Sequence, residues 1–322
     1  MKLTRQETAE LVKAIKGKVL ITTHKNPDGD AVGSSLGWFY YLKKLGKEVK
    51  LIYKDPVPHF LNFLPGTEKV ETREKIEEEF DWVIITDVSD PKRTGFERIP
   101  AKKSLVIDHH ITAEPFTDYY IVEPEISSTC ELSYHIMKLI EPELIDTFVA
   151  LPIYTGILTD TGSFNYSNTN SQTHKVAAEL LEKGIDPYFV YSNLFERNRL
   201  NKFKLLELVL KTLDFAVKNK VAHITLFKEF LEEAQALPEE AEGFINYPRS
   251  IEGVEVAVFF KEFEEGTWKV SLRSKGKVNV AKVAKAFGGG GHKMAAGFEW
   301  KGELFHLKKL LFENLETELK GN

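Results

Sequence analysis

The sequence predicts a two-domain α/β protein whose larger domain is a doubly wound, mainly parallel sheet. The chain has 322 residues, which favours two domains over one. Short apolar runs alternate with amphipathic segments through the first half, as they do in parallel sheets. The order of these segments changes later in the chain, so we expect a second, smaller α/β domain there. The predicted boundaries are 1–195 for the first domain, 196–214 for a helical linker and 215–322 for the second domain.

The elements expected in the first domain follow from apolar spacing and from capping residues. Runs rich in Val and Ile predict buried parallel strands. Apolar residues repeated every three or four positions predict helices, bounded by a capping side chain and often by glycine. The expected strands are 18–23, 48–53, 82–86 and 104–107. The expected helices are 3–15, 30–45, one capped by Ser128 or Thr129 that ends near 140, 145–158 and 171–183.

The second half begins with a charged, leucine-containing segment, 196–213, which we expect to be the helical connector. Beyond it, strands and helices follow one another in a different order. The expected strands are 221–227, 254–260 and 268–273, and the expected helices are 228–236, 278–287 and 303–319. A Glu-Glu-Gly turn at 264–266 joins the second and third of these strands.

Composition and charge exclude several classes of protein. Apolar residues make up 43% and charged residues 28% of the chain, which is ordinary for a soluble globular protein. No apolar run approaches the roughly 20 residues that cross a bilayer, and the first residues lack the apolar core of a signal peptide, so we expect no membrane association. The single cysteine, Cys130, fits a reducing cytoplasm, where we expect the protein. The net charge of −5 argues against a basic groove for long duplex nucleic acid.

Acidic and imidazole side chains stand where the predicted strands end. They are His24, Asp28 and Asp30 after the first strand, Asp87 after the third, Asp108, His109 and His110 after the fourth, and Asp160 at the end of a helix. Each alone is explained by helix capping, a turn or a surface position. Together they would meet at the carboxyl edge of one sheet, where open α/β sheets bind ligands. Several carboxylates buried there would repel one another unless cations were present.

This set of donor groups predicts a metal site. Carboxylates with a minority of imidazoles and no thiolate suit Mn²⁺ or Mg²⁺ better than structural Zn²⁺. The number of carboxylates predicts two divalent metal ions, for which we expect Mn²⁺, with Mg²⁺ as the alternative. Two ions about 3.5–4 Å apart clamp phosphate oxygens and activate a water molecule. We therefore expect the protein to hydrolyse a phosphoester.

The spacing of these residues resembles the DHH phosphoesterase superfamily. The pattern His24-x-x-x-Asp28-x-Asp30, the isolated Asp87, the triplet 108–110 and the Thr-Asp-Thr-Gly at 159–162 look like its four motifs. Further on, Ser-Leu-Arg-Ser at 271–274 and the glycine-rich stretch 287–297 look like the DHH-associated C-terminal domain. The resemblance spans almost the whole chain and is strongest to NrnA-type oligoribonucleases (nanoRNases), many of which also act on 3′-phosphoadenosine 5′-phosphate (pAp). It implies an active site in the cleft between the two domains and is compatible with a homodimer.

Roles for individual residues follow from this resemblance. It implies that His24, Asp28 and Asp87 hold one ion, and that Asp30, Asp87, His109 and Asp160 hold the second, with Asp87 bridging the two. Asp108 would accept a hydrogen bond from an imidazole N–H and orient that ring. His110 would contact the substrate phosphate or protonate the leaving oxygen, and a histidine beside metal ligands is a natural general acid. An exchange of inner and outer roles between Asp108 and Asp160 remains an alternative.

The substrate-binding residues are expected in the second domain. Glycines let backbone N–H groups approach an anion closely because they carry no Cβ. The resemblance implies that the glycine loop closes over the cleft, so that Gly289, Gly290, Gly291 and His292 bind a phosphate or sugar. Arg273 and Ser274 are expected to bind a second, terminal phosphate, since arginine suits two-pronged phosphate recognition.

The expected function is hydrolysis of very short oligonucleotides to mononucleotides by a two-metal phosphodiesterase, with pAp phosphatase activity besides. One alternative is a stand-alone phosphodiesterase for cyclic di-AMP or linear dinucleotides. A pyrophosphatase of the same superfamily would lack the glycine-rich loop, and RecJ-type exonucleases carry further nucleic-acid domains that this length does not hold. A nucleotide-binding sensor without turnover is the alternative from a different class.

Overall fold

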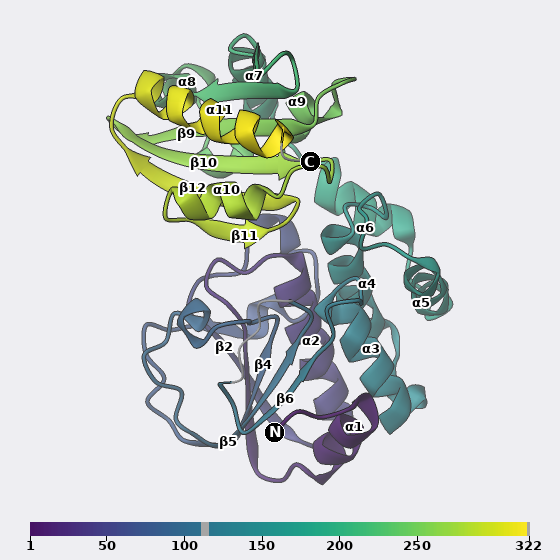
Figure 1. Ribbon diagram of the computed structural model, residues 1–322. Helices are drawn as coiled ribbons and strands as arrows, with labels where there is room; N and C mark the ends of the chain where they lie inside the picture. Colours follow the sequence, from purple (N-terminus) through teal and green to yellow (C-terminus); the bar gives the residue numbers. More distant parts are fainter. Residues whose placement is uncertain (111–115, 321–322) are drawn as a thin grey trace. The chain divides into compact units, whose positions relative to one another are not determined.

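The computed structural model describes residues 1–110 and 116–320, without the side chain of His292, and it divides into two compact units, Met1–Arg197 and Asn198–Asn322 (Figure 1). Both units are α/β, so the predicted fold class is confirmed. Within the described part of the chain, none of the helices combines the length and apolarity that crossing a membrane requires.

The first unit contains a six-stranded, all-parallel sheet in the order β3-β2-β1-β4-β5-β6. Its strands are β1 (Lys18–Thr22), β2 (Glu48–Tyr53), β3 (Val70–Thr72), β4 (Phe80–Thr86), β5 (Ala101–Asp108) and β6 (Tyr119–Val122). Its helices are α1 (Arg5–Ala14), α2 (Gly29–Lys44), α3 (Thr129–Ile140), α4 (Thr147–Asp160), α5 (Ser171–Leu181) and α6 (Pro187–Phe195). Short 3₁₀ turns occupy His59–Leu61, Thr67–Lys69, Pro91–Thr94 and Pro142–Leu144.

The two faces of this sheet are covered differently. Side chains of α1 to α4 pack with one set of strand residues into the larger core, which contains Trp38, Tyr41 and Ile107. The other face packs against irregular connections through residues such as Ile76 and Phe96. In the first unit β3 and β6 were not predicted, because they contain only three and four residues, at or below the shortest run that predicts a strand.

The second unit contains a six-stranded mixed sheet in the order β11-β12-β10-β9-β8-β7, in which only β8 and β9 run parallel. Its strands are β7 (Asp214–Ala216), β8 (Val221–Leu226), β9 (Val256–Glu264), β10 (Thr267–Ser274), β11 (Gly290–His292) and β12 (Ala295–Lys301). Its helices are α7 (Leu200–Leu210), α8 (Lys228–Ala234), α9 (Asn246–Ser250), α10 (Val280–Ala286) and α11 (Leu304–Lys320), with a 3₁₀ turn at Pro238–Ala241.

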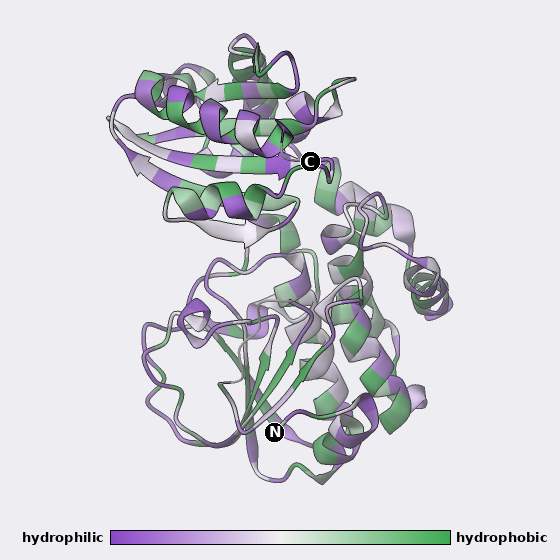
Figure 2. Ribbon diagram, viewed as in Figure 1, coloured by the Kyte–Doolittle hydropathy of each residue, from purple (hydrophilic) through white to green (hydrophobic). Residues whose placement is uncertain are grey.

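Two separate apolar clusters cover this sheet. One packs α10 and α11 against Val258, Phe260 and Leu272, and it shows as green stripes along β9 and β10 in Figure 2. The other packs α7 and the segment 230–245 against Ile224 and Phe259. The segment predicted as a linker thus contains α7, whose buried side chains lie in the core of the second unit. The strand β12 was not predicted, because its Ala-Ala-Gly start has low β-propensity.

Candidate metal centre

The turn between β1 and α2 places the first three donor residues. Asp28 caps α2, because its Oδ1 accepts hydrogen bonds from Asp30 N at 3.1 Å and Ala31 N at 3.0 Å. Its other oxygen, Oδ2, lies 3.9 Å from His24 Nε2. One carboxylate therefore both starts the helix and faces the histidine that follows the strand. Asp30 lies in the first turn of α2, where an acidic side chain is favoured by the helix dipole.

Asp87, directly after β4, lies at the centre of the cluster. Its backbone φ is +61°, in the left-handed region that aspartate tolerates better than most residues. Its N–H donates to Ile107 O at 3.0 Å, which ties this conformation to the neighbouring strand β5. Its Oδ2 lies 3.4 Å from His24 Nε2, and its Oδ1 lies 3.8 Å from His109 Nε2. The carboxylate therefore faces imidazoles on two sides.

The triplet at the end of β5 combines a buried carboxylate with two imidazoles. Asp108 is fully buried, and its Oδ1 accepts from His109 N at 2.8 Å and lies 2.7 Å from His110 Nδ1. Asp108 thus orients the ring of His110 and the backbone that leads to it. His110 Nδ1 also lies 3.4 Å from Asp87 Oδ1. The His109 Nε2, besides facing Asp87, lies 3.9 Å from Asp30 Oδ2 and 3.7 Å from Asp160 Oδ2.

Asp160 reaches the cluster because α2 and α4 pack at very short range. A Cβ on Gly33 would lie 2.4 Å from Pro152 O, and one on Gly156 would lie 3.1 Å from Gly29 O. Side chains larger than hydrogen at these positions would push the two helices apart. The glycines therefore bring the start of α2, with Asp30, next to the end of α4, with Asp160.

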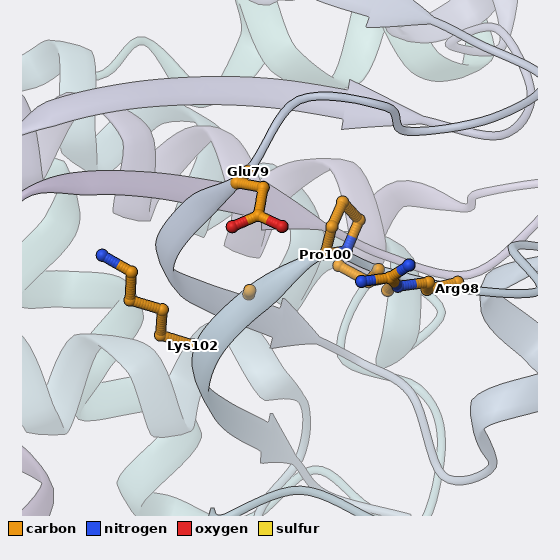
Figure 3. A pocket seen from close by; sticks show the side chains of 6 residues that line it. Glu79, Arg98, Pro100 and Lys102 are labelled. Carbon is orange, nitrogen blue, oxygen red and sulfur yellow. The ribbon is translucent and has the colours of Figure 1, made fainter.

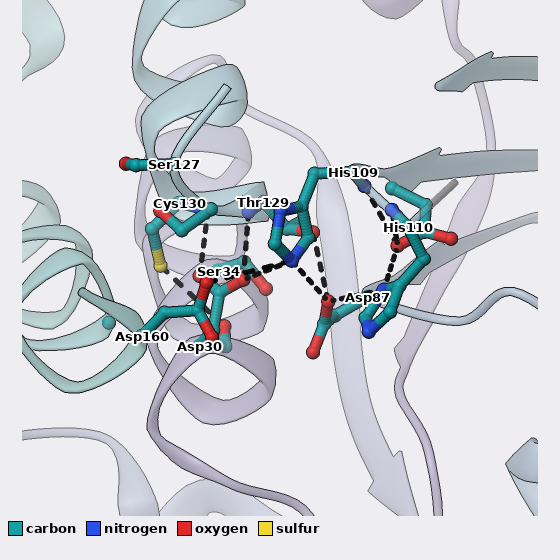
Figure 4. Close-up of polar contacts among 12 residues, drawn as sticks. Asp30, Ser34, Asp87, His109, His110, Ser127, Thr129, Cys130 and Asp160 are labelled. Carbon is teal, nitrogen blue, oxygen red and sulfur yellow. Dashed lines mark hydrogen bonds and ion pairs between the residues drawn. The ribbon is translucent and has the colours of Figure 1, made fainter. Parts of the chain in front are cut away.

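The structure forms three groups of donor atoms that could each hold a metal ion, with all donor atoms in a group within 4.8 Å of one another. They are His24, Asp28 and Asp87; Asp30, His109 and Asp160; and Asp87, His109 and His110. Figure 4 shows most of these side chains converging from separate elements. All six residues predicted as metal ligands thus come together, and Asp108 and His110 lie beside them.

The hydrogen bonds of the two candidate imidazole ligands fit a metal. His24 Nδ1 lies 2.9 Å from Lys25 O, so Nδ1 carries a proton, and in the neutral ring Nε2 is the nitrogen that can bind a metal. That Nε2 is buried and has no hydrogen-bond partner among the described residues. His109 Nδ1 similarly faces Ile126 O at 3.4 Å, and its Nε2 faces three carboxylates. Metal-binding histidines use this arrangement, in which a backbone carbonyl fixes the tautomer.

The electrostatics of the cluster show a shortage of positive charge. Burial, together with the charge of Asp87, raises the pKa of Asp30 to about 7. Burial and the neighbouring carboxylates raise the pKa of Asp160 well above its usual range. For Asp87, burial acts in the same direction, but the surrounding histidines outweigh it and lower its pKa. For His110, burial favours the neutral ring, but Asp108 and Asp87 outweigh it and raise the pKa to about 9. Divalent cations would remove this repulsion.

The predicted phosphate-binding residues of the second unit do not all face the same way. Arg273 is half-buried on β10 and alternates with Ser271 and Lys269 on one face of the sheet. Lys269 is paired with Lys261 on β9. Burial lowers the pKa of Lys261, and the charges of Lys269 and Arg273 lower it further. We call these three cations the basic face, although Glu299 of β12 is paired with Lys269 on the same side of the sheet, and the sequence did not reveal this grouping.

Ser274 lies on the opposite face of β10 from Arg273. It is fully buried, and its hydroxyl accepts a hydrogen bond from Gly276 N at 3.0 Å. The structure therefore does not bring Ser274 together with Arg273, whereas it does place Ser271 on the arginine's side of the strand.

The second half of the glycine run lies in an edge strand of the sheet. Gly290, Gly291 and His292 form β11 and pair with β12. A Cβ on Gly289 would lie 2.2 Å from Gly297 O, and one on Gly291 would lie 2.5 Å from Ala295 O. These two glycines are therefore required by the close approach of β12, while Gly290 faces open space. The predicted role of His292 concerns a side chain outside the described residues.

A small pocket elsewhere in the first unit is unrelated to this cluster. It has a volume of about 140 Å³ and is lined by Glu79, Arg98, Ile99, Pro100, Ala101 and Lys102 (Figure 3). These residues precede or begin β4 and β5, so they lie at the amino edge of the sheet, opposite the predicted ligands.

Thr129 and Asn168 also contact the cluster, although neither was predicted to belong to a metal site. Thr129 Oγ1 donates to Asp87 Oδ1 at 3.0 Å. Asn168 Nδ2 donates to Asp160 Oδ2 at 3.3 Å. A Ser-Ser-Thr sequence before a helix predicts only capping, and an asparagine after a turn predicts only a turn.

Comparisons with known proteins agree on one family. The model of the DHH family, N-terminal domain, matches residues 18–157, and the model of the DHHA1 domain matches residues 219–317. A bifunctional oligoribonuclease and PAP phosphatase NrnA from Thermus thermophilus is 36% identical, over 97% of this chain and 93% of its own. The protein of that name from Bacillus subtilis is 29% identical, over 89% of this chain and 91% of its own. An exopolyphosphatase-related protein from Bacteroides fragilis has a similar crystal structure, with a TM-score of 0.86 and 30% identity, covering 98% of this chain and 96% of its own.

Proposed function

The chain belongs to the DHH family, and on that premise we propose that it is a phosphoesterase that hydrolyses very short oligonucleotides to mononucleotides and removes the 3′-phosphate of pAp. Relatives that align along nearly the whole chain carry both activities in their names. The observation that carries the proposal is the cluster of carboxylates and imidazoles around Asp87.

The proposal assigns two divalent ions, Mn²⁺ in preference to Mg²⁺, to this cluster. His24, Asp28 and Asp87 would hold one ion, and Asp30, Asp87, His109 and Asp160 the other. Such ions supply positive charge that offsets the phosphate and make a water molecule more nucleophilic. The buried Nε2 of His24 supports this assignment, because it makes no hydrogen bond among the described residues and faces carboxylate oxygens of Asp28 and Asp87. The free, buried thiol of Cys130 supports a cytoplasmic location.

His110 is proposed to donate a proton from Nε2 to the leaving ribose oxygen. Asp108 supports this role, because its Oδ1 lies 2.7 Å from His110 Nδ1 and fixes the ring. Departure of a ribose alkoxide needs a proton, whereas departure of a nitrophenolate does not.

The basic face of the second unit is proposed to bind the remaining phosphates of the substrate. Arg273 would take a terminal phosphate, as predicted, and Lys261 and Lys269 would neutralise a neighbouring one. The glycine strand supports this role through Gly290, where a Cβ would meet open space, so that a ligand can approach the chain closely. Only a few phosphates can be neutralised by so few cations, which favours short substrates over long polymers.

A turnover panel tests the substrate assignment. The purified full chain is supplied with Mn²⁺ or Mg²⁺ and with pAp, linear oligonucleotides of two to five residues, cyclic di-AMP and pyrophosphate. We expect pAp and the short linear oligonucleotides to be hydrolysed fastest, and hydrolysis to be faster with Mn²⁺. Fastest turnover of pyrophosphate or cyclic di-AMP would overturn the proposal.

A pair of histidine variants tests the proton donor. His110→Gln is expected to lower kcat on a dinucleotide by about 10²–10⁴-fold, the usual contribution of a general acid. The same variant should lose much less activity on bis-p-nitrophenyl phosphate. His59→Gln, at an exposed histidine in a short turn, is the control and should match the wild type. Equal losses by His110→Gln on both substrates would contradict the proton-donor role.

A further inference from the structure

Residues 126–130, which lead into α3, contact three members of the cluster, Asp30, Asp87 and His109, and Asn168 connects them to a fourth, Asp160. Ser128 caps α3, because its side chain accepts from Glu131 N. Thr129 and Cys130 lie beside Asp30 and Asp87, as Figure 4 shows, whereas the hydroxyl of Ser127 donates to Glu131. The helix cap predicted from the sequence is therefore only part of what this segment does.

The first backbone N–H groups of α3 hold Asp30. Thr129 N donates to Asp30 Oδ2 at 2.7 Å, and Cys130 N donates to Asp30 Oδ1 at 2.8 Å. Both oxygens of one buried carboxylate are thereby fixed at the amino end of a helix, where negative charge is favoured. Rotation of this carboxylate would break both bonds, so its orientation is set before any cation arrives.

The hydroxyl of Thr129 holds a second carboxylate. Thr129 Oγ1 donates to Asp87 Oδ1 at 3.0 Å, and both side chains are almost completely buried. One residue therefore bonds to Asp30 through its backbone and to Asp87 through its side chain. These two carboxylates come from α2 and from the end of β4 and belong to different donor groups.

Two further contacts extend this pattern to His109 and Asp160. Ile126 O faces His109 Nδ1 at 3.4 Å. Asn168 Nδ2 donates to Ser127 O at 2.8 Å and to Asp160 Oδ2 at 3.3 Å. Residues 126–130 thus contact one imidazole and two carboxylates directly, and Asn168 connects a third carboxylate to the same segment.

We propose that residues 126–130 and Asn168 form a positioning element that sets the relative placement of Asp30, Asp87, His109 and Asp160, the residues assigned to the second ion, with Thr129 linking Asp30 to the shared Asp87. This inference rests on the proposed function. Neighbouring carboxylates repel and would turn apart without donors to hold them. A hydroxyl, an amide and backbone N–H groups hold them without adding the positive charge that the metals must supply. Partners of this kind behind a metal ligand typically change metal affinity by about 10–100-fold.

Equilibrium Mn²⁺ binding by the full chain tests the role of Thr129. Free Mn²⁺ is measured by its electron paramagnetic resonance signal during titration. Thr129→Val keeps the shape of the side chain but loses the hydroxyl, and we expect it to bind Mn²⁺ about 10–100-fold more weakly. Thr129→Ser keeps the hydroxyl and should restore binding. Thr8→Val is the matched control, because Thr8 is also buried and its hydroxyl donates to Thr4 O at 2.8 Å, outside the cluster.

Asn168→Ala provides a second variant, with Asn193→Ala as its control. Asn193 is buried in the first unit, and its Nδ2 donates to Phe189 O at 2.7 Å. We expect only Asn168→Ala to weaken Mn²⁺ binding. Unchanged binding by Thr129→Val and Asn168→Ala, or equal weakening by Thr129→Val and Thr129→Ser, would overturn the positioning role. Failure of the wild-type chain to bind Mn²⁺ would instead overturn the proposed function together with this inference.

Discussion

Neutralising Asp160 should stabilise the metal-free protein and at the same time remove much of the stability that metal adds. Burial raises the pKa of Asp160 most, and the neighbouring carboxylates of Asp30, Asp87 and Asp28 raise it further, so Asp160 is surrounded by like charges. Asp160→Asn keeps the shape and can still form a hydrogen bond, but it carries no charge. The substitution therefore separates the cost of collecting carboxylates from the benefit of binding cations.

The size of the first effect follows from the geometry. The donor oxygens of Asp30 and Asp160 lie within 4.8 Å of each other. At about that distance and an effective dielectric constant of about 20, two like charges repel by about 3.5 kcal/mol. Protonation relieves part of this repulsion, so we expect Asp160→Asn to raise the unfolding free energy of the metal-free chain by about 2 kcal/mol. For a unit of this size that raises the midpoint temperature by about 4–8 °C.

The second effect has the opposite sign. Mn²⁺ at about 100 times its dissociation constant adds about 2.7 kcal/mol to the wild-type stability. Loss of a residue that hydrogen-bonds to a metal ligand typically weakens metal binding by about 10–100-fold, and loss of the ligand itself should weaken it at least as much. At the same Mn²⁺ concentration, the gain for Asp160→Asn then falls to about 1.4 kcal/mol or less.

Calorimetric melting of the full chain, first with chelator and then with Mn²⁺, measures both effects. Asp186→Asn is the matched control, because Asp186 caps α6 away from the cluster and asparagine caps helices equally well. Melting of metal-free Asp160→Asn below the wild type would refute the repulsion among the carboxylates, and equal stabilisation of both proteins by Mn²⁺ would refute the role of Asp160 as a ligand.

Two further predictions concern the packing of buried residues, one in each unit. Gly33→Ala should lower the unfolding free energy by about 1–3 kcal/mol, because the new Cβ would lie 2.4 Å from Pro152 O, and urea unfolding that matches the wild type would contradict this close helix contact. His223 is buried between Phe260 and Phe312, and burial, then Lys308, lowers its pKa to about 4. The unfolded chain takes up this proton near pH 6.5, whereas the folded chain does not. The contribution of His223 to the unfolding free energy is therefore fully present above pH 6.5, and roughly 3 kcal/mol of it is lost as the pH drops to 4. His223→Phe should remove this part of the acid sensitivity in urea unfolding at pH 7.5 and 4.5, and an unchanged pH dependence would contradict it.

The sequence predicted those parts of the cluster that depend on strand ends. Apolar runs identified β1, β4 and β5, and the polar residues that directly follow each run had to meet at one edge of a parallel sheet. Asp160 was predicted from its motif, and the structure gives the physical reason for its position. The glycines of α2 and α4 allow the two helices to touch, which no apolar periodicity reveals.

Contacts made by backbone groups and by strand orientation could not be predicted in the same way. Thr129 and Cys130 hold Asp30 with N–H groups that any residue would offer, so their identity carries no signal. Ser274 and Arg273 were likewise predicted to bind the same phosphate because they are adjacent in the sequence, although adjacent residues of a strand face opposite sides of the sheet. The basic pair of Lys261 and Lys269 needs the register of β9 against β10, which follows from the turn between them and not from either strand alone.

The way in which the carboxylates are held determines what the cluster can bind. Among the described residues, neither Lys nor Arg forms an ion pair with Asp28, Asp30, Asp87 or Asp160, whose nearest cationic groups are histidines. Their hydrogen bonds come from backbone N–H groups, a threonine hydroxyl and an asparagine amide. These donors fix the oxygens but leave their charge uncompensated. A lysine in the cluster would stabilise the metal-free protein and compete with a divalent ion for the same oxygens. Neutral donors therefore make the repulsion among the carboxylates available as binding free energy for cations.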